Sequence, residues 1–321
     1  MSSAPLNSDT IKAEALRLGF SACGVVPAEP VGEDYVRRFD QWIAQGHHAD
    51  MQYMAGNVEK RHDPRLLVEG VRTIVSVAMN YYPARRAAGI SLYAQGRDYH
   101  DVMRQRLQEL MEAIGAEGRC FVDTAPVHER YWAWRAGLGW IGRNRQLILP
   151  GLGSSVFLGE LFILQEADRY DEPREGDCGG CNRCIAACPS GALSAEGLDA
   201  RRCLSYLTIE HRGTFPTGTR LGDTFYGCDC CQMVCPHMRQ ARPTEELAFQ
   251  PSEALLAMTA QDWQLLTVER YQQLFRGSAV KRAKYDGLVR NIQQWTIDSI
   301  EPIEAILRYR KEDEHNGSVA E

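Results

Sequence analysis

The stretch from residue 178 to 189 constrains this chain more than any other, because it carries four cysteines at fixed spacing. It runs Cys-Gly-Gly-Cys-Asn-Arg-Cys-Ile-Ala-Ala-Cys-Pro, the pattern C-x2-C-x2-C-x3-C-P. That pattern holds iron–sulfur clusters in bacterial ferredoxins, and in two-cluster proteins its fourth cysteine ligates the other cluster. A second, incomplete run and one isolated cysteine follow: Cys228, Cys230, Cys231 and Cys235-Pro236, with Cys203 between the two runs.

The spacing predicts how eight thiolates divide between two four-iron clusters. Three cysteines separated by two residues can surround one cluster, whereas the fourth, beside its proline, points elsewhere. We therefore expect one cluster on Cys178, Cys181, Cys184 and Cys235, and the other on Cys188, Cys203, Cys228 and Cys231. Cys230 is left over, because using it instead of Cys231 would break the C-x2-C-x3-C spacing. Zinc sites and disulfides are the alternatives, but zinc would leave the interleaving unexplained.

The composition places these cysteines in an ordinary globular protein. The chain has 321 residues, 44% hydrophobic and 24% charged, enough for one to three domains. Nine of its eleven cysteines lie between residues 178 and 235, which favours metal binding in a reducing compartment. No signal peptide and no apolar run of about 18 residues are evident, so we expect a soluble cytoplasmic protein. The net charge of −6 argues against a globally basic nucleic-acid binder, but leaves room for a local basic patch.

The apolar patterns predict three domains and a tail. Residues 1–165 alternate between helical and strand patterns, which indicates a three-layer α/β (α+β) domain. Residues 166–243 hold the cysteine runs among turns, so metal binding would largely fold this ferredoxin-like domain. Residues 244–310 return to helical spacing, and residues 311–321 are typical of a frayed polar tail. The predicted strands cover residues 22–27, 73–80, 120–122 and 156–164, and the predicted helices end near residues 18, 46, 115 and 136.

Asp123 is a candidate for chemistry outside the cysteine runs. It follows the predicted strand 120–122, and strand ends in α/β domains face ligand crevices, so its carboxyl group could act as an acid. Equally, Asp123 or Thr124 could cap a helix that begins near Pro126. The local sequence leaves both interpretations open.

Two further patterns concern nucleotides and nucleic acids. Gly137-x-Gly139-x-x-Gly142 formally matches a dinucleotide fingerprint, but it follows a predicted helix rather than a strand, so its context fails. The stretch from Arg276 to Arg290 carries five cations against one acid. In an acidic chain, such a patch favours contact with phosphates, although a solvated helix face is the alternative.

Together these features resemble the epoxyqueuosine reductases, cobalamin- and iron–sulfur-dependent enzymes of the last step of tRNA queuosine synthesis. The resemblance covers nearly the whole chain up to about residue 295 and depends on the order of its motifs. The motifs are Glu59-Lys-Arg61-His-Asp-Pro64, Asp98-Tyr99-His100, Val122-Asp123-Thr124, Gly137-Leu-Gly-Trp-Ile-Gly142-Arg-Asn144, Arg202-Cys203-Leu-Ser205-Tyr-Leu-Thr208, Gly227-Cys228-Asp229 and Arg276-Gly-Ser278.

The resemblance implies a function, cofactors and site residues. It implies an oxidoreductase that reduces epoxyqueuosine to queuosine in the anticodon loop of tRNA, using cob(II)alamin and two [4Fe-4S] clusters. It also implies that Asp123 is the proton donor. The implied cobalamin-binding residues are Arg61, Asp123, Leu147, Leu158, Ser205, Cys228 and Asp229. The implied tRNA contacts are Arg212, Gly213, Lys281, Arg282 and Lys284.

The implied reaction sets further expectations. Removing an epoxide oxygen to leave an alkene consumes two electrons and two protons and releases water, and the leaving oxygen needs a general acid. Because the ordinary pKa of Asp is about 3.9, Asp123 would have to be desolvated to hold its proton. No Asp-x-His-x-x-Gly motif supplies an axial His, so we expect apolar side chains such as Leu147 and Leu158 to cover the lower face of cobalt. We expect a monomer that receives electrons from a donor such as a flavodoxin or ferredoxin, without contact with membranes.

Departures from the family and rival functions also follow from the sequence. Arg143-Asn144-Arg145 stands where the family usually has Lys-Asn-Thr, and the chain stops where many members continue into HEAT-like repeats, leaving a short HEAT-like segment. A reductive dehalogenase-like corrinoid enzyme would share the cluster logic, but usually carries an export signal. A dicluster electron carrier would not need about 165 residues before its clusters. A tRNA-binding module without chemistry would leave eight thiolates without a purpose.

Overall fold

The computed structural model describes residues 4–298. The predicted tail at residues 311–321 and the end of the predicted helical segment 244–310 therefore lie outside the described residues. None of the helices in the described part is long and apolar enough to cross a membrane.

The N-terminal region is built on a four-stranded sheet with the strand order β1-β2-β7-β4. Every pairing in this sheet is antiparallel. The rule that places ligands at strand ends applies to parallel sheets, so that argument for Asp123 was wrong in its premise. The strands match the predicted ones to within two residues: β1 (Ala22–Pro27), β2 (Thr73–Asn80), β7 (Val156–Ile163) and β4 (Gly118–Phe121).

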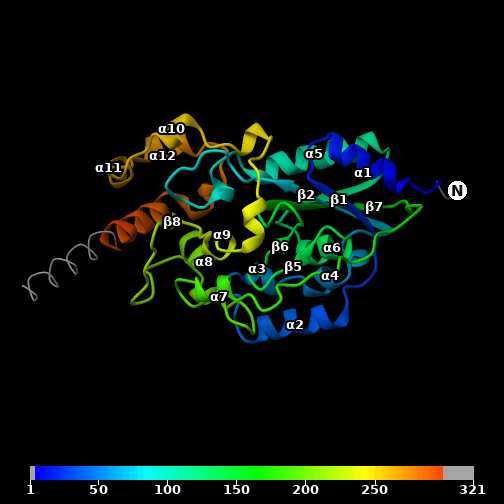
Figure 1. Ribbon diagram of the computed structural model, residues 1–321, viewed down its shortest axis with the longest axis horizontal. Helices are drawn as coiled ribbons and strands as arrows, with labels where there is room; N and C mark the ends of the chain where they lie inside the picture. Colours follow the sequence, from blue (N-terminus) through cyan, green and yellow to red (C-terminus); the bar gives the residue numbers. More distant parts are fainter. Residues whose placement is uncertain (1–3, 299–321) are drawn as a thin grey trace, which may run out of the picture.

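Helices cover both faces of this sheet and form the three layers that the sequence predicted (Figure 1). Side chains of α1 and α5 pack on one face with Val75 and Val77, and side chains of α6 pack on the other with Ile74 and Ala78. Strand β2 is buried at every position, which explains why five of its eight residues are apolar and none is charged. The helices of this region are α1 (Ser8–Arg17), α2 (Glu33–Ala44), α3 (Gln52–Ala55), α4 (Val58–His62), α5 (Tyr99–Ala113) and α6 (Glu129–Arg135).

The cysteine-rich region contains short elements, as predicted. A small hairpin of β5 (Trp140–Ile141) and β6 (Leu147–Ile148) precedes it. Its own elements are α7 (Arg183–Ala186), α8 (Leu204–Ile209), β8 (Thr224–Tyr226) and α9 (Cys230–Met233). Helix α7 packs against α9, so the two cysteine runs lie side by side.

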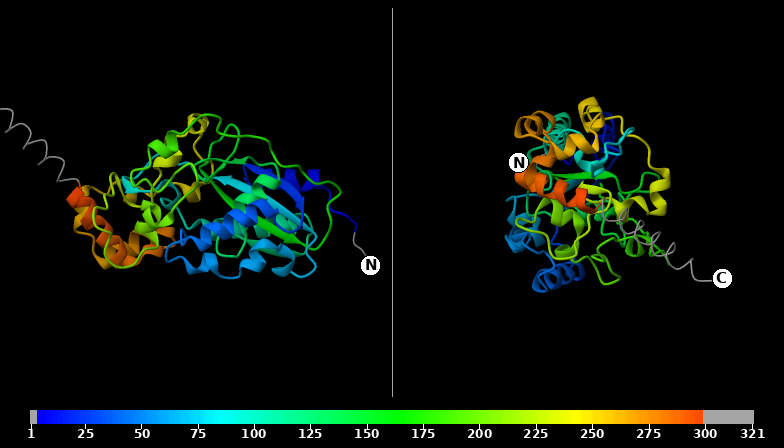
Figure 2. Two further views of the ribbon diagram at one scale, coloured as in Figure 1. Left: turned by 90° about the horizontal axis from the view of Figure 1, so that it is seen from below. Right: turned by 90° about the vertical axis from the view of Figure 1, so that its left-hand side faces the viewer.

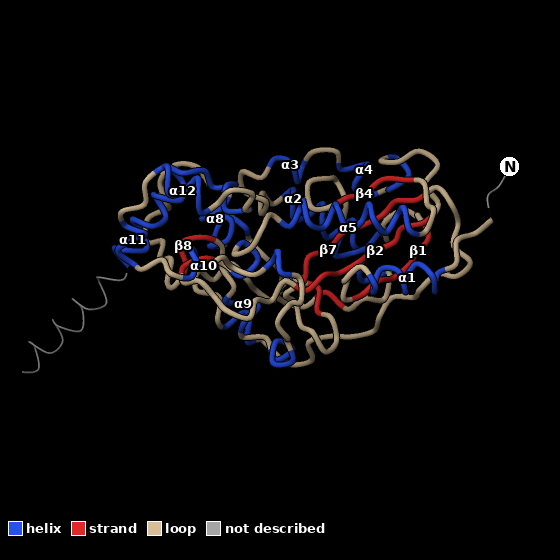
Figure 3. The backbone as a smooth tube through the Cα atoms, turned by 90° about the horizontal axis from the view of Figure 1, so that it is seen from above, coloured by secondary structure: helices blue, strands red, loops and turns tan. Residues whose placement is uncertain are grey.

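The C-terminal region is helical and shares its core with earlier segments. Its elements are α10 (Glu253–Leu256), α11 (Ala260–Gln264), α12 (Val268–Leu274), the 3-10 helix η6 (Ala279–Ala283) and a helix over residues 284–298. Their apolar side chains pack with Ile90 and Phe225, where β3 (Gly89–Ile90) pairs in parallel with β8. This region lies at the end of the molecule opposite the N-terminus and beyond the sheet (Figures 2 and 3).

Candidate functional site

Asp123 lies in a tight turn directly after β4. Its backbone φ is +57°, and the N–H group of Thr124 donates to the carbonyl oxygen of Val122 at 2.6 Å. A turn closed in this way around a residue with positive φ is rare and strained, although Asp tolerates the left-handed region better than most residues. Such strain concentrates at functional sites. The buried side chain of Val122 holds one arm of the turn in the core.

The cap interpretation of Asp123 was wrong. Helix α6 begins at Glu129 rather than near Pro126, and its N-cap is His128, which makes no side-chain capping bond. The carboxylate of Asp123 instead accepts hydrogen bonds from two other side chains, Tyr99 and His100. Its side chain is 58% exposed. The turn therefore presents a carboxylate to the surface without using it to cap a helix.

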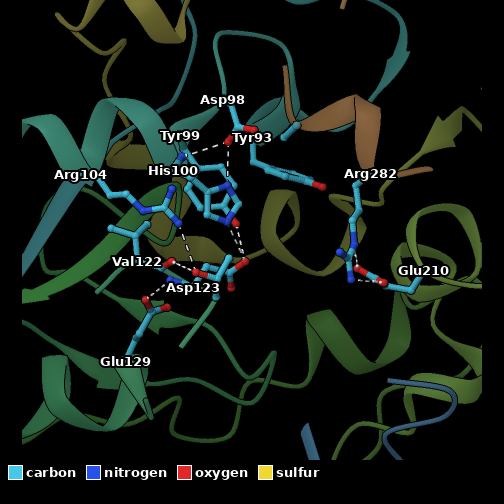
Figure 4. A network of polar contacts seen from close by, with 12 residues as sticks. Tyr93, Asp98, Tyr99, His100, Arg104, Val122, Asp123, Glu129, Glu210 and Arg282 are labelled. Carbon is cyan, nitrogen blue, oxygen red and sulfur yellow. Dashed lines mark hydrogen bonds and ion pairs between the residues drawn. The ribbon is translucent and has the colours of Figure 1, made fainter. Parts of the chain in front are cut away.

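The first turn of α5 supplies the partners of Asp123 (Figure 4). Asp98 caps this helix by accepting a hydrogen bond from the N–H group of His100. The cap fixes the following residues so that Tyr99 Oη donates to Asp123 Oδ2 at 2.8 Å and His100 Nε2 lies 3.2 Å from the same atom. His100 Nδ1 lies 2.7 Å from Asp98 Oδ1. The imidazole is thus held between two carboxylates.

The site holds one proton on the His100–Asp123 pair. Burial lowers the pKa of His100, but hydrogen bonds to Asp123 and Asp98 more than offset this and raise it to about 9. Partial desolvation by the surrounding protein raises the pKa of Asp123, but the bonds from His100 and Tyr99 outweigh it and leave that pKa below its usual value. The expectation that Asp123 holds its own proton concerns a site covered by corrin and substrate, so it stays a prediction. At neutral pH the proton resides on His100, one hydrogen bond away.

A half-buried and a fully buried carboxyl group lie near Asp123, and the sequence did not single them out. Glu129, in the first turn of α6, accepts a hydrogen bond from the N–H group of Asp123 and so holds the strained turn. Burial and the carboxylate of Asp123 raise the pKa of Glu129 to about 8. Glu160 on β7 is fully buried beside Ser76, and burial raises its pKa well above the usual range. For Glu160, the only signal in the sequence was the presence of an acid inside an otherwise apolar strand.

An ion pair lies across from Asp123 in Figure 4. Arg282 donates two hydrogen bonds of 2.9 Å to the carboxylate of Glu210. Its guanidinium carbon also lies 5.8 Å from the ring centre of Tyr53. The bond to Glu210 raises the pKa of Arg282, and Asp123 adds to the rise. Residues separated by more than 150 positions thus share one electrostatic environment.

The structure brings together the four thiols predicted for the first cluster. Burial raises the pKa of Cys235, and Cys178 and Cys181 add to the rise. Cys184 is likewise affected by Cys178 and Cys235 after its own burial raises its pKa. Such mutual influence requires the sulfur atoms to be close. In the described residues no three His, Cys, Asp or Glu side chains converge tightly enough for a single metal ion.

The four thiols predicted for the second cluster are also neighbours. Burial raises the pKa of Cys231 to about 12, with Cys203 and Cys188 adding to the rise. A bond to Cys230 raises the pKa of Cys228, and Cys203 contributes. The assignment of ligands to each cluster stays a prediction. The exposed thiol of Cys230 is hydrogen-bonded to Cys228.

The second cysteine set is tied to the Asp123 network. Asp229 accepts a hydrogen bond from the hydroxyl group of Ser91 and another, of 2.8 Å, from the N–H group of Leu92. These residues begin the short helix η2 (Leu92–Ala94), a few positions before α5. Burial raises the pKa of Asp229. Hydrogen bonds therefore link the second cysteine set to the loop that leads into α5.

The glycine-rich loop packs against the first cysteine set rather than forming a dinucleotide site. The N–H group of Arg143 lies 3.4 Å from the sulfur of Cys178, and its guanidinium group donates to the carbonyl oxygens of Gly179 and Cys181. Asn144 donates to the carbonyl oxygen of Cys231 at 3.4 Å. In the sequence these residues belong to a motif of the family resemblance, and Arg143 is also a departure from the family pattern. Their role as a clasp between both runs appears only in three dimensions.

The predicted cobalamin-binding residues have different surroundings. Arg61 is buried on α4, its Nε atom has no hydrogen-bond partner, and burial lowers its pKa. Leu147 is fully covered in the core on the α6 face, and Leu158 packs beside it, half-buried. Ser205 is half-buried in the first turn of α8, two residues after Cys203. Leu158 is partly exposed, whereas Arg61 and Leu147 are both enclosed by protein.

The predicted tRNA contacts also differ among themselves. Lys281 and Arg282 lie on η6, and Lys284 interrupts the helical path with a φ of +60°, so these three cations do not lie on one continuous helix. Arg282 pairs with Glu210, and Arg212 donates to the carbonyl oxygen of Arg282. Gly213 accepts a hydrogen bond from Arg290, which is engaged with several backbone carbonyls. Lys281 and Lys284 are exposed, and within residues 4–298 neither forms an ion pair.

Known proteins resemble this chain over most of its length. The family model for the epoxyqueuosine reductase QueG matches residues 61–124, and the model for a 4Fe-4S double cluster binding domain matches residues 177–238. An epoxyqueuosine reductase from Cellulophaga algicola is 42% identical over 298 residues, covering 89% of this chain and 97% of the relative.

Two solved structures are similar over most of the chain. One is an epoxyqueuosine reductase crystallised with an epoxyqueuosine-modified tRNA-Tyr stem loop. It has a TM-score of 0.83 and 27% identity, and the match covers 90% of this chain and 80% of that one. The other is an epoxyqueuosine reductase from Bacillus subtilis, crystallised with its aspartate catalytic loop swung out of the active site. Its TM-score is 0.82 at 26% identity, covering 90% of this chain and 81% of that one.

Proposed function

Because this chain belongs to the epoxyqueuosine reductase family and reduces epoxyqueuosine to queuosine in tRNA with a double 4Fe-4S domain, we propose that it also binds cobalamin and delivers a proton through Asp123. The observation that carries the proposal is the strained turn that holds the Asp123 carboxylate against Tyr99 and protonated His100. The Bacillus subtilis relative has an aspartate on its catalytic loop, which supports the same role for Asp123 here.

The residues near Asp123 fit a cobalamin. A buried guanidinium group with an unpartnered Nε, as in Arg61, is costly unless a polar or anionic group approaches it. Burial lowers the pKa of Arg61, whereas the charges of Tyr35, Glu129 and Tyr53 raise it. Because Glu129 also holds the turn of Asp123, Arg61 belongs to the same surroundings as Asp123. Arg61 would hold a polar side group of the corrin, and Leu158 would face its apolar surface. Bound cobalamin would supply a reductant that acts at carbon.

Replacing Arg61 by Met tests the cobalamin proposal. The variant keeps the apolar stem but removes the charge, so the dissociation constant for cobalamin should rise roughly 10- to 100-fold, as for a lost charged hydrogen bond. Titration followed by visible absorption measures it. Arg65→Met, which removes an exposed guanidinium paired with Asp63, is the control and should leave binding unchanged. A wild-type protein with no corrin absorption change on adding cobalamin would refute the proposal.

The chain's own groups move the proton. Asp123 receives a proton from His100 through their hydrogen bond and passes it to the oxygen that leaves the reacting carbon. Glu129 orients the Asp123 carboxylate by accepting a hydrogen bond from the N–H group of Asp123. The repulsion between neighbouring carboxyl groups limits how many of them are ionised at once. Together with two electrons, two protons convert the epoxide to an alkene and water.

We also propose that the C-terminal helical segment binds the tRNA backbone, through Lys281 and Lys284 more than through the paired Arg282. Lys281→Ala/Lys284→Ala should weaken tRNA binding and lower the slope of log affinity against log salt by roughly 1.5, since each phosphate contact contributes about 0.7–0.9. Filter binding at several salt concentrations measures both. Arg72→Ala/Arg119→Ala, which removes two exposed cations at the far end of the sheet, is the control. An unchanged salt slope would make these lysines a solvated face.

A further inference from the structure

The surface beside the first cysteine set contains a hollow that the reaction itself does not use. Its volume is about 700 Å³, and a neighbouring hollow of about 520 Å³ shares Arg183, Ala186 and Pro236 with it. Two predicted ligands of the first cluster, Cys181 and Cys235, line these hollows. The rest of the larger lining is mainly apolar: Ala186, Ala187, Met233, Val234, Pro236 and Met238.

Two cations flank this apolar lining. Arg183 on α7 and Arg239 after Cys235 are both exposed, and in the described part of the chain neither guanidinium group forms an ion pair. Two other arginines near the cysteine runs are engaged: Arg143 clasps the loop of Cys178, and Arg201 pairs with Asp199. An apolar centre with free cations at its edge is the composition of a transient docking surface for an acidic protein.

The position of the hollow fits electron delivery. Cys235 and Cys181 belong to the first set, whereas the second set is tied through Asp229 to the loop before α5 and thus to Asp123. Electrons that arrive over the first set can therefore pass to the second and on to the reaction. Weak redox encounters bury little surface, so a hollow of this size suffices.

We propose that the hollow beside Cys181 and Cys235, flanked by Arg183 and Arg239, is the docking site of an acidic one-electron carrier protein. The proposal rests on the double 4Fe-4S domain and names the partner that reduces it. In each encounter the reduced carrier loses one electron, and the cluster beside the hollow gains it. Two encounters supply the two electrons that removal of one epoxide oxygen as water consumes. RNA is the competing occupant, but six apolar side chains between two cations suit a protein surface better than a phosphate backbone.

Charge reversal tests the proposal. The holoenzyme variant Arg183→Glu/Arg239→Glu is mixed with a reduced acidic flavodoxin in a stopped-flow instrument, and bleaching of cluster absorption is followed. The second-order rate constant at low salt should fall by roughly 10- to 100-fold, and its dependence on salt should weaken, because steering of this kind is electrostatic. Reduction by methyl viologen radical, which is too small to need the hollow, should keep its rate. Affinity for tRNA should also be unchanged.

A matched control and a second variant make the test decisive. Arg72→Glu/Arg119→Glu makes the same change in net charge at the other end of the sheet and should leave flavodoxin reduction fast. Ala186→Trp fills the hollow without changing charge and should slow flavodoxin but not viologen, provided that iron content is normal. Equal slowing by both double variants would overturn the proposal. So would a loss of tRNA affinity with normal flavodoxin reduction, which would assign the surface to RNA. Failure of cobalamin binding would leave these rates unaffected, so the two proposals fail separately.

Discussion

Replacing Asp123 by Asn should lower the turnover of epoxyqueuosine by a factor of 10² to 10⁴, the range for a lost general acid. Asn has nearly the same shape and tolerates a positive φ, so the strained turn should remain. Its amide oxygen can still accept hydrogen bonds from Tyr99 and His100, but it cannot carry a proton to the leaving oxygen. Single-turnover reduction of a modified tRNA stem loop, with product nucleosides separated by mass spectrometry, measures the rate.

The control and the pH dependence separate proton transfer from damage. Asp101→Asn changes an exposed acid in the first turn of α5, which also holds Tyr99 and His100, and this variant should react at the wild-type rate. The pair loses its proton as pH rises through the His100 pKa of about 9, so wild-type turnover should fall above that pH. Because Asp123 raises that pKa, Asp123→Asn should lower it, which NMR of the imidazole can follow. Near-wild-type turnover in the Asn variant would transfer the acid role to His100 itself.

Replacing Cys203 by Ala should abolish turnover while leaving about half of the iron. The residue precedes α8 and lies near Cys188 in the set predicted to hold the second cluster. Without its thiolate that cluster should be lost, whereas the first set keeps all four ligands. Iron analysis should then give about four atoms per chain instead of about eight. Because the second set is the one tied to the Asp123 network, no reduced product should form.

Cys230→Ala is the matched control for this prediction. Its thiol is exposed and lies next to the predicted ligand Cys231 in the sequence. The variant therefore removes one thiol from the same cysteine-rich region without removing a predicted ligand. We expect both clusters and full activity in this variant. A Cys203→Ala protein with an unchanged iron content would contradict the pairing, and loss of iron from Cys230→Ala would place that thiol among the ligands.

Local patterns predicted much of the fold. The apolar runs located the four strands of the main sheet to within two residues, and β2 is largely apolar because both of its faces are buried. The same patterns could not reveal that neighbouring strands are antiparallel. That choice depends on how chain segments of some fifty residues return to the sheet, for example between β1 and β2.

The candidate site was predicted unevenly. Asp123 was identified, but its proton state was not, since the pKa values depend on His100 and Asp98 at the start of another element. The sequence showed the positive charge of the basic patch, but not that the guanidinium group of Arg282 is paired with Glu210, which is 72 positions away. Glu129 gave no signal at all, because its partner is a backbone N–H group exposed only by a strained turn.

The sequence by itself determined the double cluster domain, because thiolates that surround one cluster must come from a short loop, and their spacing is therefore written along the chain. Only the tertiary structure decided which carboxyl groups hold protons, which cations are free and where a carrier protein can dock. Those properties arise from burial and from charges of distant segments: His100 against Asp123, Glu210 against Arg282, and α7 against α9. Electrostatic interactions act through space and not along the chain.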